Sequence, residues 1–257
     1  MNEIVKLNIL QFSAVYLLLI VVLAIMKKSK INQTKLLIIA SFRMTVQLVL
    51  AGLILTYIFK NPNPLFTVAY IFVMLVFSIY RVINKNKQLN NKFKLIIGLS
   101  MGGSGLLILL FFIGGIVQVN IFNAQYAIPI GGMIIGNSMT GVLLALKKFN
   151  ESLSEQKIKI ETLLNIGATP KQILLPFVNN ALETALLPTL NSMLGMGIIA
   201  LPGMMTGQIL SGTLPSTAIL YQIAIMISIC TAVCLTVFCS LNFGYRTLFN
   251  DKNQLKI

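Results

Sequence analysis

The stretch Lys147–Pro176, KKFNESLSEQKIKIETLLNIGATPKQILLP, is the only long polar segment in a chain of successive apolar runs. Ser152 and Glu155 have the spacing of a capping box, which predicts that an amphipathic helix begins there. Gly167 predicts where it ends, because glycine adopts the left-handed conformation at a helix C-terminus without a side-chain penalty. The expected apolar face of this helix comprises Leu153, Ile160, Leu163 and Leu164.

A second helix start follows directly. Thr169 suits the N-cap, Pro170 suits the first helical position, and Gln172 stands three residues after the cap. We therefore expect a new short helix at a sharp angle to the first. The whole segment predicts a helix, a corner and a helix between two hydrophobic spans, a form suited to presenting a rigid surface to a partner.

Composition identifies an integral membrane protein. The 257 residues are 56% hydrophobic and 10% charged, whereas a soluble domain carries about 25% charged residues. The net charge of +14 does not indicate nucleic-acid binding, because the basic residues fall in short loops between apolar runs. The chain has no histidine, which excludes histidine metal sites and histidine acid–base catalysis. We expect no catalytic residue and no cofactor bound by this chain.

Apolar length predicts an all-α fold with seven membrane-spanning helices, since about 20 apolar residues cross a bilayer. We treat residues 1–257 as one permease-like membrane domain in the plasma membrane, with 147–176 as an insert. The expected spans are Asn8–Met26, Leu36–Phe59, Leu65–Ile83, Leu95–Val117, Ala127–Leu146, Phe177–Leu201 and Ala218–Phe243. The first run lacks a basic start and a small-residue cleavage site, so we expect it to be retained.

Lysine and arginine positions predict the orientation. The loops after the first, third, fifth and seventh spans carry most of these residues, and the opposite connections offer only Lys6 and Lys60. The N-terminus is therefore expected outside, and the C-terminus and the insert in the cytosol. The basic residues used are Lys27, Lys28, Lys30, Lys35, Lys85, Lys87, Lys92, Lys94, Lys147, Lys148, Lys157, Lys159, Lys171, Arg246, Lys252 and Lys256.

Small and sulfur-bearing residues recur inside the spans. Glycine pairs four residues apart predict close helix packing: Gly98 with Gly102, Gly132 with Gly136, and Gly203 with Gly207. Cys230 and Cys234 share a helix face, while Cys239 follows in the same run. Buried packing is the common role for such cysteines, and a thiolate ion site is the alternative.

Polar residues at membrane depth are costly and indicate either a pathway or interhelical hydrogen bonding. Arg43 and Glu183 are expected at similar depth, where they would pair either to lock two spans or to gate a path. The segment Pro202–Gln208, PGMMTGQ, predicts a broken helix or re-entrant turn. The expected translocation pathway comprises Arg43, Gln47, Asn137, Ser138, Glu183, Asn191, Met204, Met205 and Gln208.

Both oxygen and sulfur side chains at membrane depth are candidate metal ligands. The candidates are Glu183, Met204 and Met205. The methionine thioethers suit copper(I). The oxygen donors Glu183, Asn191, Asn137 and Gln208 suit iron(II) better. No GxxxxGK[ST] phosphate loop occurs, so ATP and Mg²⁺ would be bound by a separate ATPase subunit.

Four motifs closely resemble the FetB-type ABC transporter permease family over nearly the whole chain. They are Gly132–Met139 (GMIIGNSM), Pro188–Met193 (PTLNSM), Leu201–Leu210 (LPGMMTGQIL) and the following SGTLPSTAILYQI to Ile223. The bacterial members of this family are described as iron exporters, and plant relatives are linked to aluminium tolerance. The resemblance implies a permease homodimer in the lipid bilayer with two copies of a separate ABC ATPase.

The insert also resembles the EAA loop of ABC importers. Glu161 precedes Gly167 by six residues, although the gap from Gly167 to Ile173 is shorter than the usual pattern. This resemblance implies that the corner docks in a groove of the ATPase. The residues expected to couple the two subunits are Glu161, Gly167, Ala168, Thr169 and Pro170.

The function expected from these observations is the membrane subunit of an ATP-driven exporter, with iron or another metal ion as cargo. An exporter of a small organic substrate is an alternative. A secondary transporter or channel is disfavoured, because Glu183 is the only carboxylate within a span. A membrane scaffold is disfavoured by the broken polar segment after Leu201, which a scaffold does not need.

Overall fold

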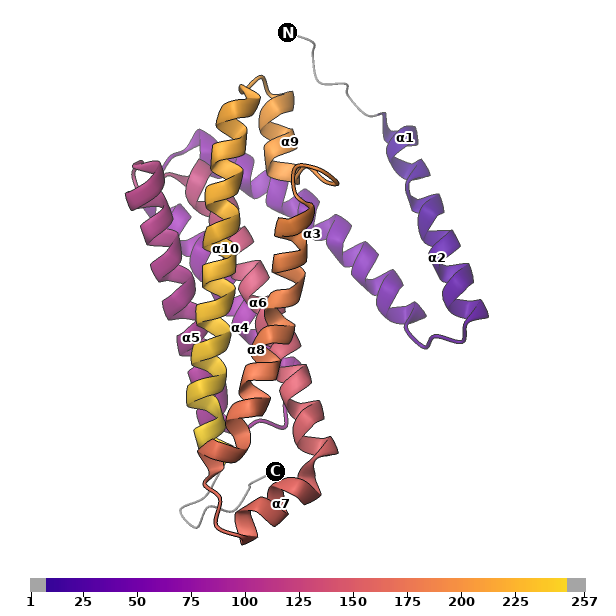
Figure 1. The fold of residues 1–257 in the computed structure, drawn as a ribbon. Coiled ribbons are helices and arrows are strands. Elements are labelled where there is room, and N and C mark those ends of the chain that lie inside the picture. Colours follow the sequence, from indigo (N-terminus) through magenta and orange to yellow (C-terminus); the bar gives the residue numbers. More distant parts are fainter. Residues whose placement is uncertain (1–7, 249–257) are drawn as a thin grey trace. The chain divides into compact units, whose positions relative to one another are not determined.

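The computed structural model describes residues 8–248, which are almost entirely helical (Figure 1). They form two compact units, and each is described here by itself. The first contains α1 to α3, and the second contains α4 to α10 with η2, except that Leu210–Gly212 group with the first. The helices are α1 (Ile9–Ala14), α2 (Tyr16–Lys28), α3 (Thr34–Lys60), α4 (Pro64–Lys85), α5 (Asn91–Leu110), the π-helical η1 (Phe111–Val117), α6 (Ala124–Glu155), α7 (Lys157–Asn165), α8 (Pro170–Gly195), α9 (Gly203–Leu210), α10 (Pro215–Gly244) and the 3-10 helix η2 (Tyr245–Leu248).

The predicted all-α membrane fold and its seven spans are confirmed. Within residues 8–248, seven helical segments are long and apolar enough to cross a membrane: Gln11–Lys28, Thr34–Lys60, Pro64–Lys85, Asn91–Val117, Ala124–Glu155, Pro170–Gly195 and Pro215–Leu248. The predicted orientation stays a prediction, and its Lys6, Lys252 and Lys256 lie outside the described residues.

In the first unit, α2 and α3 are joined by a short turn and diverge from it (Figure 1), and their side chains are mostly exposed. A hydrogen bond joins the hydroxyl groups of Tyr16 on α2 and Thr45 on α3. Because so few of its apolar side chains are covered within the chain, this unit depends on surrounding lipid or on further protein to cover them.

The second unit is a bundle in which α6 and α10 hold the central positions (Figure 1). Helix α10 packs against α5, α6 and α8, and α6 packs against α4, α5 and α8. The core between them contains fully buried aromatic and aliphatic side chains, among them Phe93, Phe112, Phe149, Ile134 and Ile225. Helix α7 lies across one end of this bundle, and α9 lies at the opposite end (Figure 1).

Close glycine packing occurs, but mostly not at the predicted pairs. Gly132 alone among those six has a tight neighbour, since an added Cβ would lie 3.1 Å from the Met74 Cε. The closest approaches are at Gly141, where a Cβ would lie 2.7 Å from Val233 Cγ1, and at Gly244, which packs on Phe93. The four-residue spacing of the predicted pairs therefore does not show where two helices come closest, because the closest helix crossings of this bundle lie at other glycines.

Candidate functional site: a helical corner and a cavity joined by α8

The corner at Gly167 forms as predicted. Gly167 has a φ of +91°, a left-handed conformation that residues with a Cβ rarely adopt. Its N–H donates to the Leu164 carbonyl at 3.0 Å, and the Ala168 N–H donates to the Leu163 carbonyl at 3.0 Å. These two bonds are those of a Schellman motif, which satisfies the last carbonyl groups of α7.

The predicted cap at Thr169 is also confirmed. The Gln172 N–H donates to the Thr169 Oγ1 at 3.4 Å, and the Thr169 N–H donates to the Gln172 Oε1 at 3.0 Å, which is a reciprocal capping box. Pro170 occupies the first helical turn, where its missing N–H has no helical partner to lose. The C-terminal capping motif of α7 is therefore followed directly by the N-terminal capping box of α8.

Two local expectations for the insert are wrong. The predicted helix start at Ser152 does not occur, because α6 continues to Glu155 and the helix ends only at its C-cap, Gln156. Ser152 and Leu153 are buried in α6, so packing of this face extends the helix past the capping pattern. The predicted short helix after Thr169 is instead the first part of α8, which runs unbroken through Pro176 and Pro188 to Gly195.

Helix α7 has one buried face and one exposed face. Ile160 is fully buried and Leu163 and Leu164 are half-buried, as predicted. Ile158 and Ile166 are 82% and 74% exposed, which the sequence analysis missed although their eight-residue spacing was a possible signal. Glu161 is exposed as well, with its carboxylate 4.0 Å from the Lys157 amine, so this ion pair adds little stability.

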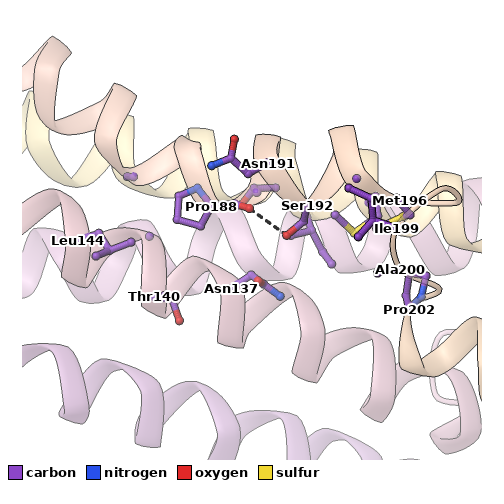
Figure 2. Close-up of a pocket in the computed structure, with 16 residues that line it drawn as sticks. Asn137, Thr140, Leu144, Pro188, Asn191, Ser192, Met196, Ile199, Ala200 and Pro202 are labelled. Carbon is purple, nitrogen blue, oxygen red and sulfur yellow. Dashed lines mark hydrogen bonds between the residues drawn. The ribbon is translucent and has the colours of Figure 1, made fainter.

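At the other end of α8, a cavity of about 530 Å³ lies between α6, α8 and α10. Figure 2 shows Asn137 and Thr140 on α6 opposite Pro188 and Ser192 on α8, with Met196–Pro202 at one end. Met226 and Ile229 of α10 complete the lining, which contains no charged side chain. The structure thus brings together Asn137 and Asn191, two of the predicted pathway residues, from helices far apart in sequence.

Hydrogen bonds around the cavity are mostly local. The Asn137 amide nitrogen donates to the Met133 carbonyl at 2.7 Å, and the Ser192 hydroxyl donates to the Pro188 carbonyl at 2.9 Å. The amide oxygen of Asn137 therefore stays available as an acceptor. Among the described residues, the Asn191 side chain is exposed and has no hydrogen-bond partner. Both asparagines can contact a molecule inside the cavity.

Interhelical hydrogen bonding, the alternative explanation for polar residues in the spans, occurs elsewhere in the bundle. The hydroxyl groups of Ser104 on α5 and Thr236 on α10 share a hydrogen bond. The Asn90 amide donates to the Thr247 carbonyl at 2.7 Å. These bonds join α5 to the C-terminal half of the last span. Neither bond involves a residue that lines the cavity.

The remaining predicted pathway residues do not line the cavity. Ser138 points into the core with 1% exposure, and its buried hydroxyl has no partner within the described chain. Glu183 is exposed on α8, twelve residues before its end, which is about 18 Å along the helix axis. Arg43 and Gln47 lie on α3 in the first unit. The pairing of Arg43 with Glu183 and the role of both α3 residues in a pathway stay predictions.

The break predicted at Pro202–Gln208 lies earlier in the chain: α8 ends at Gly195, residues 196–202 are not helical, and most of the predicted segment forms a regular helix. The chain turns at Gly197, whose φ is +84°, and then forms the short helix α9. Met205 is buried there, while Met204 and Gln208 are half-buried. Because Glu183 lies on α8 well before this segment, the proposed metal ligands Glu183, Met204 and Met205 are spread over two elements. No group of three or more His, Cys, Asp or Glu residues suited to a metal ion occurs among residues 8–248.

Comparison with known proteins gives one family and several relatives. The family described as "Uncharacterised protein family (UPF0014)" matches residues 9–249. The UPF0014 membrane protein YjkA of Bacillus subtilis (strain 168) is 32% identical, with coverage of 96% of this chain and 98% of the relative. The "Probable iron export permease protein FetB" of Escherichia coli (strain K12) is 28% identical, with coverage of 97% and 96%.

One relative is a plant protein. The "Protein ALUMINUM SENSITIVE 3" of Arabidopsis thaliana is 33% identical, with coverage of 83% of this chain and 77% of the relative. No solved structure matches the chain. The predicted resemblance to FetB-type permeases is confirmed, and the relatives' names support a multi-pass membrane protein.

Proposed function

The chain belongs to the uncharacterised protein family UPF0014, and from this premise we propose that it is the membrane-spanning permease subunit of an ATP-binding cassette transporter. It would act as a homodimer with a separate cytosolic ATPase that binds ATP and Mg²⁺. The E. coli relative named as a probable iron export permease matches this chain over nearly its whole length, which supports a permease role and suggests a metal ion as cargo.

The observation that carries this proposal is the continuity of α8. One helix of 26 residues, about 39 Å long, begins at the Thr169 cap beside the corner and ends in the wall of the cavity. A rigid helix transmits a displacement of one end to the other end. Movement of the corner by an ATPase would therefore displace Pro188, Asn191 and Ser192 at the cavity, which is the two-state coupling that transport requires.

The exposed face of α7 supports docking of the partner. Ile158 and Ile166 place large apolar side chains in solvent beside the corner, and the predicted orientation puts this end of the bundle in the cytosol. Covering these two side chains would remove apolar surface from water, which is favourable. A groove on the ATPase that received α7 and the Gly167 corner would cover both side chains.

The exposed outer surface of α8 supports association of two copies. Leu187, Leu190 and Leu194 are exposed on this helix next to the residues that line the cavity. A second copy packed on this side would enclose the cavity and hold the cargo away from lipid. Enclosure is what an alternating-access pathway needs, because cargo must reach one side of the membrane at a time.

The test is ATP hydrolysis by the complex of this chain with a cytosolic ABC ATPase of the same organism, reconstituted in lipid. Gly167→Val is expected to abolish the stimulation of ATP hydrolysis by the permease, since a β-branched residue is strained at a φ of +91°. Gly167→Asn is the matched variant and is expected to retain most of the stimulation, because asparagine tolerates this conformation.

Membrane insertion is followed for both variants, so that loss of the protein is separated from loss of coupling. Normal stimulation in Gly167→Val would overturn the coupling role of the corner. Cargo movement by the purified chain alone, driven by an ion gradient, would replace the proposal with a secondary transporter.

A further inference from the structure

Acidic residues are absent from more than half of the chain. No aspartate or glutamate occurs from residue 4 to residue 150, although lysine and arginine are frequent there. In the insert, by contrast, lysines have carboxylates one helical turn away, and the Lys157 amine lies 4.0 Å from the Glu161 carboxylate. The basic residues of the long stretch therefore need counter-charges from outside it.

Part of this uncompensated charge gathers at the turn between α4 and α5. Lys85 ends α4, Lys87 follows it, and Lys92 and Lys94 lie at the start of α5. The Lys94 amine donates to the Lys87 carbonyl at 2.9 Å, which holds the two sides of the turn together. Among the described residues, none of these four lysines has a carboxylate partner.

The end of the last span adds a fifth positive charge beside this turn. The Asn90 amide, at the cap of α5, donates to the Thr247 carbonyl at 2.7 Å, so η2 lies against the turn. Arg246, the neighbour of Thr247, is exposed. The basic cluster is therefore defined as Lys85, Lys87, Lys92, Lys94 and Arg246.

The orientation signal alone does not require this arrangement. Lysines that set topology need only lie on one side of the membrane. Here the basic segments are brought together by a hydrogen bond between residues 157 positions apart in the chain. Convergence of like charges is unfavourable unless an anion lies among them, so the cluster indicates an anionic ligand.

Exposed apolar side chains continue from the basic cluster along the spans. On α5, Lys92 is followed at helical spacing by Leu95 and Leu99, which are 63% and 68% exposed. At the end of α10, the Arg246 Cζ lies 5.8 Å from the centre of the exposed Phe243 ring. Each cation therefore lies at the end of an apolar surface, which matches a ligand with a charged head and a long apolar tail.

We propose that the basic cluster binds the headgroup of an anionic phospholipid, whose acyl chains lie along Leu95, Leu99 and Phe243. Lysine and arginine donate charge-assisted hydrogen bonds to phosphate oxygens. Groups of basic residues at the end of a membrane helix are typical of anionic-lipid binding. The inference does not rest on the proposed function, because lipid binding needs neither an ATPase nor a cargo.

Binding is measured by native mass spectrometry of the purified chain in detergent. Phosphatidylglycerol is the anionic lipid and phosphatidylcholine is the neutral one, and we expect tighter binding of the anionic lipid. The Lys92→Gln/Arg246→Gln variant should weaken that binding on the order of 20-fold, about fivefold for each charge removed. The Lys92→Arg/Arg246→Lys variant keeps both charges and should bind like the wild type. Equal affinity of the wild type for the two lipids would overturn the site.

The matched control is the Lys157→Gln/Lys159→Gln variant. It removes two exposed charges from α7, which lies at the same end of the second unit as the C-terminal end of α10 (Figure 1). This variant should bind phosphatidylglycerol like the wild type. Equal weakening in both charge-removing variants would show that net charge alone attracts the lipid, and would overturn the site. Unfolding temperatures measured without lipid show which variants remain folded.

Glycerol 3-phosphate distinguishes a lipid from a free anion. It carries a phosphate group without acyl chains and should not displace phosphatidylglycerol when both are present at the same concentration. Displacement would replace the lipid with a soluble phosphate ligand and would overturn the proposal.

Salt provides a measurement that needs no variant. Phosphatidylglycerol should raise the unfolding temperature of the wild-type chain in detergent, because it binds the folded state and joins α5 to η2. Raising NaCl from about 0.1 M to about 1 M shortens the Debye length from about 10 Å to about 3 Å and should remove most of that rise. An equal rise at both salt concentrations would overturn the role of the charges.

Discussion

Gly244 of α10 packs directly on the ring of Phe93 at the start of α5: a Cβ built on Gly244 would overlap the Phe93 ring at Cε2, and both residues are buried. Any larger residue must displace the ring or separate the two helices. We expect Gly244→Ala to destabilise the protein by about 1–3 kcal/mol, the usual cost of overpacking a core. Thermal unfolding in detergent measures this loss.

The matched control is Gly103→Ala. Gly103 lies in α5, and an added Cβ there would meet no atom within 4 Å. This variant should keep the wild-type unfolding temperature or raise it slightly, since alanine favours the helix. Equal destabilisation by the two substitutions would show that the contact between Gly244 and Phe93 does not set the cost.

The capping box at the corner predicts a graded effect. Thr169→Ala removes the hydroxyl that accepts from the Gln172 N–H, and we expect a local loss of about 1 kcal/mol. Thr169→Ser keeps the hydroxyl and should behave like the wild type. Hydrogen exchange of the first turn of α8 measures the loss directly. Faster exchange in Thr169→Ser as well would show that the methyl group, and not the cap, holds the turn.

Local signals in the sequence predicted this corner correctly and the ends of the insert wrongly. Gly167 and Thr169 act through backbone conformation and a bond over three residues, so their roles can be read from the sequence. Ser152 has the same local signal, but its face is buried, and packing keeps it inside α6. The short helix expected after Thr169 and the span expected from Phe177 form one helix that contains Pro176, because membrane helices tolerate proline where neighbours satisfy the freed carbonyl group.

Tertiary relationships account for what the sequence could not predict. The sequence shows polar residues within the spans of both α6 and α8, yet nothing in their spacing showed that Asn137 and Asn191 line one cavity while Ser138 faces the core. In the same way, the predicted glycine pairs have the spacing of a close helix contact, but the closest contacts occur at Gly141 and Gly244, which belong to none of those pairs. Which face of a helix meets a neighbour depends on the crossing of the helices.

The predicted orientation can be tested at the two ends of α6. Gln125 and Ser154 are both exposed, and they are separated by 29 residues of one helix, about 44 Å. In a background without native cysteines, an impermeant maleimide added to intact cells should label the Gln125→Cys variant and not the Ser154→Cys variant. Disruption of the cells should make the second variant reactive. The reverse pattern in intact cells would place the insert outside.

Adjacent residues on α6 provide the sharpest test of the cavity. Asn137 lines it, whereas Ser138, the next residue, is buried in the core with an unsatisfied hydroxyl. We expect Asn137→Ala to reduce cargo-stimulated ATP hydrolysis in the reconstituted complex, with little effect on unfolding temperature, because its amide bonds only to its own helix. Ser138→Ala should retain stimulation and be equally or more stable, since a buried hydroxyl without a partner costs about 1–3 kcal/mol. Loss of stimulation in Ser138→Ala but not in Asn137→Ala would move the pathway from the cavity to the core face of α6.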